Sequence, residues 1–151
     1  MNRRRFDSRR NRGGKLPRNA APVELTISHV GGRGDGVGRA PYKHNHITDE
    51  HSVFVPATLA GEQVVATPVA ISGQGIRAVL HEIITPSPER REPDCAAFPA
   101  CGGCSFQHWR DESVTAWKQD LVTGFLARAG VPCPEMIPVS YTHLTLPTNS
   151  G

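Results

Sequence analysis

Three of the four cysteines of this chain fall within one run of ten residues, Cys95-Ala-Ala-Phe-Pro-Ala-Cys101-Gly-Gly-Cys104. A loop this short can bring three thiolates to one soft metal centre, and the two glycines leave the backbone free to fold around it. Three ligands are one fewer than a closed four-ligand site needs. The sequence therefore predicts a metal centre whose fourth ligand comes from elsewhere.

The identity of that centre has three readings. A disulfide framework is disfavoured, because no apolar stretch that could act as a signal peptide follows the N-terminal arginines. Zinc stays open, since Cys101-x-x-Cys104 is a common half-site that Cys133 or a histidine such as His108 could complete. Zinc sites usually pair two such half-sites, and this sequence has one. The C-x5-C-x2-C spacing therefore favours an iron–sulfur cluster over zinc.

The charge of the chain is unevenly distributed. Residues 1–18 hold eight basic side chains and one acidic one, whereas the remainder carries more acidic than basic groups. A dense positive block with almost no apolar content cannot bury a core, so we expect residues 1–20 to form a disordered arm. Such an arm either attracts phosphate backbone through counterion release or only keeps the chain soluble.

Composition limits the size of the fold. With 151 residues, 38% of them hydrophobic, the chain can support one compact domain of roughly 60 to 80 residues plus appendages. No apolar run approaches the ~20 residues needed to span a bilayer. We therefore expect no membrane partner and a cytoplasmic location.

From about Pro22 onward, short apolar alternations are separated by glycine clusters, a pattern typical of a mainly β fold. Several strands at this spacing predict a small antiparallel barrel over residues 21–86. Pro56 and Pro68 are then expected at strand ends, edges or bulges. The strand candidates are residues 23–27, 53–55, 64–71 and 76–84.

The glycine-rich segment at residues 31–39 matches neither a dinucleotide fingerprint nor a phosphate loop. Val37 occupies the position where the fingerprint needs its last glycine, and no Lys-Ser or Lys-Thr pair follows the glycines. The segment is therefore interpreted as a turn between strands. Arg33 and Arg39 remain available there to contact phosphates.

Residues 111–129 are predicted to form one amphipathic packing helix. Asp111 and Glu112 favour its N-terminal end, and Gly130 followed by Pro132 ends it. The apolar positions at three- and four-residue steps are Val114, Trp117, Leu121, Phe125 and Leu126. Together with the cysteine run, this helix makes up a second predicted segment, residues 87–133.

The run Cys-Gly-Gly-Cys-Ser-Phe-Gln-His at residues 101–108, followed by a helix bearing Lys118, resembles the cluster-binding region of the RNA uracil-5-methyltransferases. It is most similar to the bacterial 23S ribosomal RNA enzymes that carry a [4Fe-4S] cluster, and the resemblance covers about residues 22–132. It implies that Cys95, Cys101 and Cys104 are three of four cluster ligands. The fourth ligand of the family lies downstream of this chain, which leaves Cys133 an ordinary cysteine.

The first predicted segment has a resemblance of its own. Val-Glu-Leu-Thr-Ile at residues 23–27, Gly-Asp-Gly-Val-Gly-Arg at 34–39 and Val-Phe-Val-Pro at 53–56 resemble a TRAM domain, the OB-like barrel that precedes the cluster region in these methyltransferases. The resemblance implies an RNA-binding surface. The first-choice RNA contacts are Arg33, Arg39 and Lys43, with Tyr42, His44 and His46 as further candidates.

The family reaction transfers a methyl group from S-adenosylmethionine to carbon 5 of uracil, using a cysteine nucleophile and a general base. The resemblance places the donor pocket and these catalytic groups in an α/β domain that is absent here. We therefore expect this chain to be an enzyme fragment that binds RNA, 23S ribosomal RNA rather than transfer RNA, holds three cluster ligands and has no catalytic residue or activity. No protein partner is indicated.

Residues from about 139 onward do not continue the family pattern and look like a translated sequencing adapter, so residues 134–151 are interpreted as a non-native tail. Two alternatives to the enzyme fragment remain. One is a stand-alone RNA-binding module with a structural zinc or iron–sulfur site. The other is a radical S-adenosylmethionine enzyme, which the cysteine spacing and the order of the segments disfavour.

Overall fold

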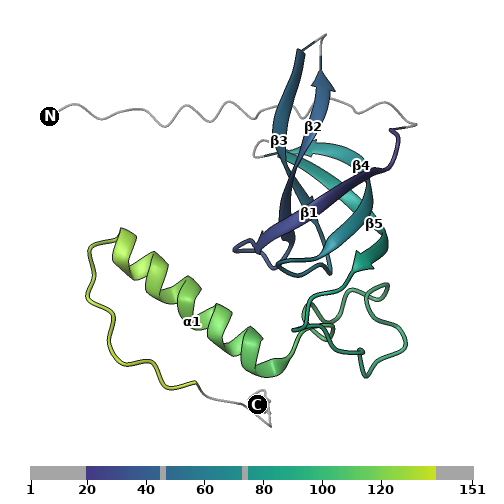
Figure 1. Ribbon diagram of the computed structural model, residues 1–151. Helices are drawn as coiled ribbons and strands as arrows, with labels where there is room; N and C mark the ends of the chain where they lie inside the picture. The colour runs from purple at the N-terminus through teal and green to yellow at the C-terminus, as the bar shows by residue number, and fades with distance from the viewer. Residues whose placement is uncertain (1–19, 45–46, 73–74, 139–151) are drawn as a thin grey trace, which may run out of the picture. The chain divides into compact units, whose positions relative to one another are not determined.

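The computed structural model describes residues 20–44, 47–72 and 75–138 (Figure 1). Side chains at 42–44, 47–49 and 72 lie outside this description, as do residues 1–19 of the predicted arm and 139–151 of the predicted tail. The chain divides into two compact units, Met1–Arg110 and Asp111–Gly151. The first contains a barrel and the cysteine run, and the described part of the second contains one helix.

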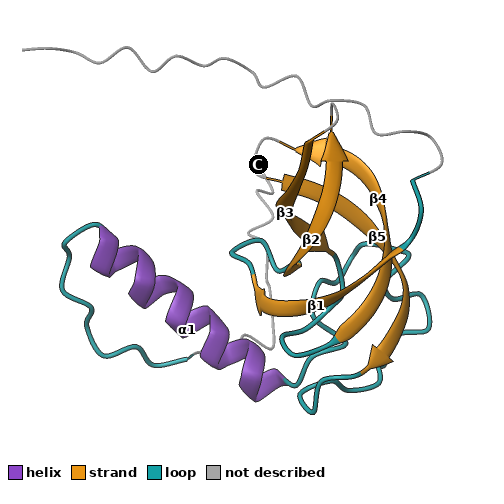
Figure 2. Ribbon diagram, turned by 45° about the horizontal axis from the view of Figure 1, so that its top comes forward, coloured by secondary structure: helices purple, strands orange, loops and turns teal. Residues whose placement is uncertain are grey.

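Five strands of the first unit close into a barrel (Figures 1 and 2). Their order around the barrel is β1-β2-β3-β5-β4, and β1 closes the ring by pairing with β4. The mainly β fold and the small barrel predicted from the sequence are confirmed. The strands are β1 Val23–Val30, β2 Gly36–His44, β3 Ile47–Val55, β4 Gln63–Ser72 and β5 Gly75–Thr85.

One strand contact departs from the expected antiparallel pattern. The β3–β5 contact is parallel, with Val53 opposite Ile76 and Phe54 opposite Arg77. The other four contacts of the barrel are antiparallel. Strand directions can alternate around a closed ring only if the number of strands is even, so five strands require at least one parallel pair. The parallel contact therefore follows from closing five strands into a ring.

The barrel interior is filled by aliphatic side chains that alternate with exposed polar ones along each strand. In β1, Leu25 and Ile27 are buried, whereas Glu24 and Thr26 are exposed. This alternation confirms the strand predicted from the same residues. The buried core consists of Leu25, Ile27, Ala40, Val53, Val55, Val64, Ala66, Ile76 and Ala78.

The glycine-rich turn is shorter than predicted, because β2 already begins at Gly36. A Cβ atom at Gly38 would lie 2.6 Å from the carbonyl oxygen of Thr26 on β1. Glycine is therefore needed here for close approach of two strands, not for a turn. The turn itself covers residues 31–35, where Gly34 has φ +88°.

The prolines lie where a missing N–H group can be tolerated. Pro56 directly follows the end of β3, and the register of β4 against β5 shifts between Pro68 and Ala70. Both positions confirm the prediction of strand ends and bulges.

The second unit contains the predicted helix, α1, at Asp111–Arg128. The N–H of Val131 donates to the carbonyl of Leu126 at 3.0 Å, and that of Gly130, at φ +69°, donates to Ala127 at 3.1 Å. This pair of bonds is a Schellman motif, which confirms Gly130 as the stop. Within the described residues, no helix is both long and apolar enough to cross a membrane.

Candidate cysteine centre and RNA-binding surface

The three clustered cysteines surround one small pocket in the first unit. Cys95, Cys101 and Cys104 are all exposed and unpaired by disulfides. A loop with free, accessible thiols on one pocket is chemically suited to a thiolate-bound metal. The other lining residues are Phe98, Gly102, Gly103 and Gln107.

Local hydrogen bonds fix the backbone around this pocket. The N–H of Cys95 donates to Oε1 of Gln107 at 3.1 Å, which joins the two ends of the motif. The N–H of Gly103 lies 3.4 Å from Sγ of Cys101, and Gly102 adopts φ +69°. Hydrogen bonds from backbone N–H groups to sulfur are among the features that tune iron–sulfur centres.

The thiols surround the pocket without converging on a point. Among the described residues, no group of three or more His, Cys, Asp or Glu side chains is arranged to hold a metal ion. The donor set nevertheless fits a soft metal, since the pocket lining contains three thiols and no carboxylate or imidazole. The assignment of Cys95, Cys101 and Cys104 as ligands therefore stays a prediction.

Cys133 and His108 were the sequence candidates for a fourth zinc ligand. Cys133 belongs to the second unit, where its Sγ lies 3.7 Å from Oγ1 of Thr123. His108 is in the first unit but is not part of the pocket lining. Its ring stacks on Phe98, with centroids 5.4 Å apart.

His108 is a buried imidazole with unusual surroundings. It is 1% exposed, and neither ring nitrogen has a hydrogen-bond partner among the described residues. Burial, together with the positive charge of Arg90, lowers the pKa of His108 to about 4. The ring is therefore neutral at physiological pH and behaves as part of the packing beneath the cysteine loop.

A short antiparallel ladder closes the base of the cysteine loop. The N–H of Arg91 donates to the carbonyl of His108 at 3.0 Å, and the N–H of Arg110 donates to Glu89 at 3.1 Å. Arg90 and Trp109 form the bridge between these bonds. The segments before and after the cysteines are thus held side by side, which the sequence analysis did not predict.

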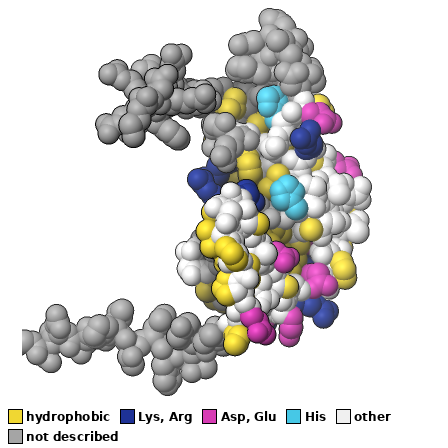
Figure 3. Space-filling view, turned by 90° about the vertical axis from the view of Figure 1, so that its left-hand side faces the viewer, with side chains coloured by type: hydrophobic (Ala, Val, Ile, Leu, Met, Phe, Trp, Pro, Cys, Tyr) yellow, Lys and Arg dark blue, Asp and Glu magenta, His cyan; other side chains and the backbone are white. Residues whose placement is uncertain are grey.

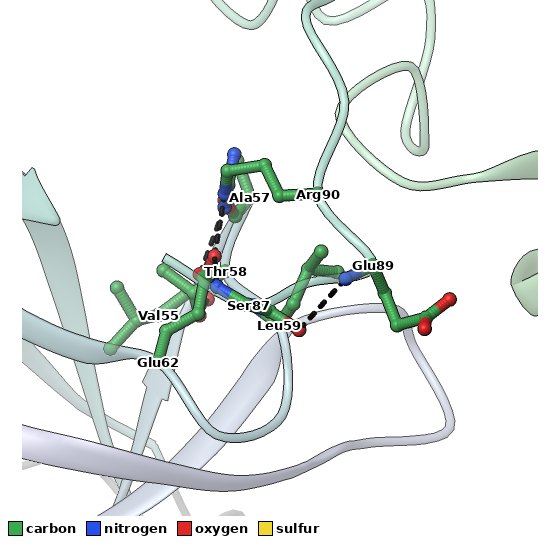
Figure 4. A network of polar contacts seen from close by, with 8 residues as sticks. All are labelled: Val55, Ala57, Thr58, Leu59, Glu62, Ser87, Glu89 and Arg90. Atoms are coloured by element: carbon green, nitrogen blue, oxygen red, sulfur yellow. Dashed lines mark hydrogen bonds and ion pairs between the residues drawn. The ribbon is translucent and has the colours of Figure 1, made fainter. Parts of the chain in front are cut away.

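A buried ion pair attaches this ladder to the barrel (Figure 4). Glu62, in the turn before β4, is 0% exposed. Its carboxylate accepts hydrogen bonds from Nε and Nη2 of Arg90 at 2.5 and 2.9 Å. It also accepts the N–H groups of Leu59 at 2.8 Å and Ser87 at 3.2 Å. Arg90 donates further to the carbonyl of Ala57 at 2.8 Å.

The electrostatics of Glu62 follow from these contacts. Burial by itself raises the pKa of a carboxyl group, but the hydrogen bonds from Arg90, Leu59 and Ser87 and the charge of Arg90 outweigh it. The pKa of Glu62 is therefore lowered, and the ion pair is fully formed at neutral pH. A buried charge with this many partners fixes the position of the cysteine loop on the barrel.

The predicted RNA contacts lie on the β1–β2 side of the barrel. Arg33 is exposed in the turn at residues 31–35, and the Arg39 side chain on β2 is 72% exposed beside Glu50, with N and O atoms 3.5 Å apart. Arg39 lines an open hollow together with polar side chains of β1 and β4. On the face drawn in Figure 3, basic side chains lie at separate places instead of in one patch.

Other predicted contacts fall outside the described side chains. Tyr42, Lys43 and His44 lie at the end of β2, where only the backbone is described, and His46 is outside the described residues. The structure thus places Arg33 and Arg39 on neighbouring parts of one unit. It leaves Lys43 a prediction.

Comparison with known proteins gives a consistent family. No family model matches the chain. An uncharacterised RNA methyltransferase of Caulobacter vibrioides is 40% identical over 108 residues, 72% of this chain and 23% of that protein. One of Brucella suis is 38% identical over 108 residues, with the same two shares, 72% and 23%. The 23S rRNA (uracil(1939)-C(5))-methyltransferase RlmD of Dichelobacter nodosus is 38% identical over 89 residues, 59% of this chain and 21% of that protein.

The chain is homologous to a segment of the RNA methyltransferases. The family resemblance predicted from the cysteine motif is thereby confirmed. The chain spans about a quarter of the length of these curated relatives, 23% for two of them.

Within this RNA methyltransferase segment, sequence reasoning missed the residues that join the barrel to the cysteine loop. Glu62 and Arg90 are 28 positions apart, and each looks like an ordinary surface charge in the sequence. Both residues lie within residues 22–132, the span of the family resemblance, and nothing else in the sequence marks them. Their pairing itself has no local signature.

Proposed function

We propose that this chain is the RNA-binding and cluster-holding part of a cytoplasmic, S-adenosylmethionine-dependent methyltransferase that forms 5-methyluridine in 23S ribosomal RNA. The observation that carries the proposal is a closed barrel joined by the Glu62–Arg90 ion pair to a loop of three exposed thiols. The relatives named as RNA methyltransferases support it. We interpret the barrel as the TRAM domain of the family.

In this proposal the barrel contacts the phosphate backbone of RNA. Arg33 and Arg39 supply exposed guanidinium groups, and Lys43 is the third contact predicted from the sequence. The ion pair of Arg39 with Glu50 does not oppose this, because exposed pairs are worth only about 0–1 kcal/mol and exchange readily for a phosphate. Backbone contacts of this kind position RNA without reading its sequence.

The cysteine loop is proposed to hold a [4Fe-4S] cluster through Cys95, Cys101 and Cys104, with the fourth ligand outside this chain. The exposed free thiols, the shared pocket and the N–H group of Gly103 beside a sulfur support this ligand set. When bound, the cluster would fix the loop through its metal–sulfur bonds, or it would itself contact RNA. The ladder and the Glu62–Arg90 pair keep the loop beside the barrel in either case.

The methyl donor and the catalytic groups are assigned to the part of the relatives that this chain does not span. Arg33, Arg39 and the cysteines bind and orient, and none of them is proposed to react with uracil. We therefore predict that the purified 151-residue chain transfers no methyl group to RNA. Incorporation of labelled methyl groups from S-adenosylmethionine would contradict this.

Fluorescence anisotropy with a labelled 23S ribosomal RNA fragment tests the binding role. We expect Arg33→Ala and Arg39→Ala to weaken binding and to reduce its salt dependence by about one phosphate contact each. Arg128→Ala, in the last turn of α1, is the matched control and should leave both unchanged. Equal weakening by all three variants would contradict the assigned surface, and equal affinity for transfer RNA would remove the substrate preference.

A further inference from the structure

Phe106 connects the cysteine loop to the turn that carries Arg33. A Cβ atom at Gly34 would lie 2.7 Å from Cε1 and 2.8 Å from Cζ of Phe106, so the edge of the ring rests directly on the Gly34 backbone. Any other residue at position 34 would displace this ring. Gly34 is thus required both for its positive φ of +88° and for its contact with Phe106.

Phe106 is itself held by the cysteine segment. It lies two residues after Cys104, and its carbonyl accepts the N–H of Trp109 at 3.0 Å. Its ring meets the Trp109 ring edge-on, with centroids 6.2 Å apart. The next residue, Gln107, reaches the N–H of Cys95. One short strip of chain therefore contacts the thiol pocket through Gln107 and the Arg33 turn through Phe106.

The turn at residues 31–35 is short and rich in glycine. Two backbone hydrogen bonds close it, Gly31 N–H to Asp35 carbonyl and Gly34 N–H to Gly31 carbonyl, both 2.8 Å. Three of its five residues are glycine, which loses the most conformational freedom when it is ordered. The Phe106 ring packs on this turn at Gly34, the residue next to Arg33.

We propose that Phe106 is a positioning residue for RNA binding, which couples occupancy of the cysteine centre to the conformation of the 31–35 turn. This inference rests on the proposed function. Metal bonds at Cys104 would restrain the strip, Phe106 would restrain Gly34, and Arg33 would be presented to phosphate in one conformation. Because linkage is reciprocal, RNA would tighten metal binding by the same factor as metal tightens RNA binding.

The coupling requires two states of one element, which we assign to the turn. In this proposal the turn is less ordered while the thiols are unliganded and holds one conformation once the centre is filled. RNA that binds only the ordered turn then binds more tightly, because the metal has already met the free-energy cost of ordering it. The Glu62–Arg90 pair does not involve the thiols, and in this proposal it keeps the loop attached to the barrel in both states.

The test compares RNA affinity of the full chain before and after anaerobic loading with iron and sulfide, with added thiol to occupy the fourth ligand position. For the wild type we expect loading to tighten binding of a labelled 23S ribosomal RNA fragment by about 5-fold or more. Hydrogen exchange at the Gly34 amide should slow in parallel. The exchange measurement reports on the turn without RNA.

Phe106→Leu keeps apolar bulk but loses the ring edge. This variant should still bind iron and RNA, but its RNA affinity should no longer increase when the centre is loaded. Phe125→Leu, at an aromatic side chain on α1 that is 59% exposed, should keep the increase. Arg33→Ala provides a second variant at an exposed position and should also lose the gain while retaining iron.

The outcomes separate the two proposals. A full gain in Phe106→Leu overturns the positioning role, and so does a wild type that binds RNA equally well in both states. A wild type that binds no RNA in either state overturns the proposed function and this inference together.

Discussion

The barrel and the cysteine loop are stabilised by different physical means, although they belong to one compact unit. In the barrel, Val55, Val64 and Ala66 are 0% exposed, and every strand pairs with two neighbours. In the loop, Cys95 and Cys104 are exposed, and order comes from a short ladder and the Glu62–Arg90 pair. The barrel therefore folds on its own apolar burial. The loop depends on charged contacts at its base and, in our proposal, on metal.

The largest expected effect comes from breaking the ion pair between the two regions. Glu62→Gln leaves the Arg90 guanidinium largely buried without its charge partner, so we expect a loss of about 4 kcal/mol in the free energy of unfolding. Urea denaturation measures this loss, and hydrogen exchange should rise most in the cysteine loop.

Glu50→Gln is the matched control for that prediction. Its ion pair with Arg39 is exposed, since the Glu50 side chain is 66% and the Arg39 side chain 72% accessible. The free energy of unfolding should therefore change by less than about 0.5 kcal/mol. If both glutamate variants cost the same, burial of the Glu62 pair is not what attaches the loop.

Acid should act on the base of the loop before it acts on the barrel core. His108 has its pKa lowered from the ordinary 6.5 to about 4, so the folded state favours the neutral ring. This contribution is complete above pH 6.5 and is lost as pH falls from 6.5 toward 4, in total about 3 kcal/mol. The pKa of Glu62 is also lowered, so protonation of Glu62 reduces the free energy of unfolding further at lower pH.

Urea unfolding at a series of pH values checks the direction of this stability change and the pH range in which it occurs. His108→Phe, which keeps a ring beside Phe98 but cannot be protonated, should flatten the dependence between pH 6.5 and 4. Phe125→Leu, at an exposed ring of α1, leaves His108 in place and should keep this dependence. A wild-type stability that rises on acidification through this range would contradict the assignment.

Glycine-to-alanine substitutions should destabilise the barrel more than the cysteine loop, but by a smaller difference than the changes above. Gly38→Ala places a Cβ atom 2.6 Å from the Thr26 carbonyl oxygen inside the barrel, and backbone there cannot give way, so we expect a loss of about 2 kcal/mol. Gly102→Ala in the cysteine loop meets no atom within 4 Å. It should cost about 1 kcal/mol, from its φ of +69° alone. Thermal unfolding compares the two, and equal losses would mean that the barrel relaxes around the new methyl group.

What the sequence predicted correctly are features that a few consecutive residues encode. The alternation of Leu25 and Ile27, the helix stop at Gly130 and the cysteine motif that indicated the family are all of this kind. The start of β2 at Gly36 was missed, because glycine in a closed barrel serves strand approach as well as turns. Such close approach depends on Thr26 and Thr58, which belong to other segments.

The connections between the regions could not be predicted for a related reason. Glu62 and Arg90, and likewise Gly34 and Phe106, meet only after the barrel has closed and the cysteine loop has folded back on it. No short-range pattern marks such pairs, since a charge in a turn or an aromatic after a cysteine is usually a surface or a local packing residue. The parallel β3–β5 contact similarly follows from the number of strands in the ring.

Anaerobic loading with iron and sulfide of the wild type and four cysteine-to-serine variants tests the central claim most directly. The wild type and Cys133→Ser should develop sulfide-to-iron charge-transfer absorption when thiol is added. Cys95→Ser, Cys101→Ser and Cys104→Ser should each lose most of it. Loss of the absorption in Cys133→Ser, or equal absorption in all five proteins, would contradict a cluster held by the three-cysteine loop.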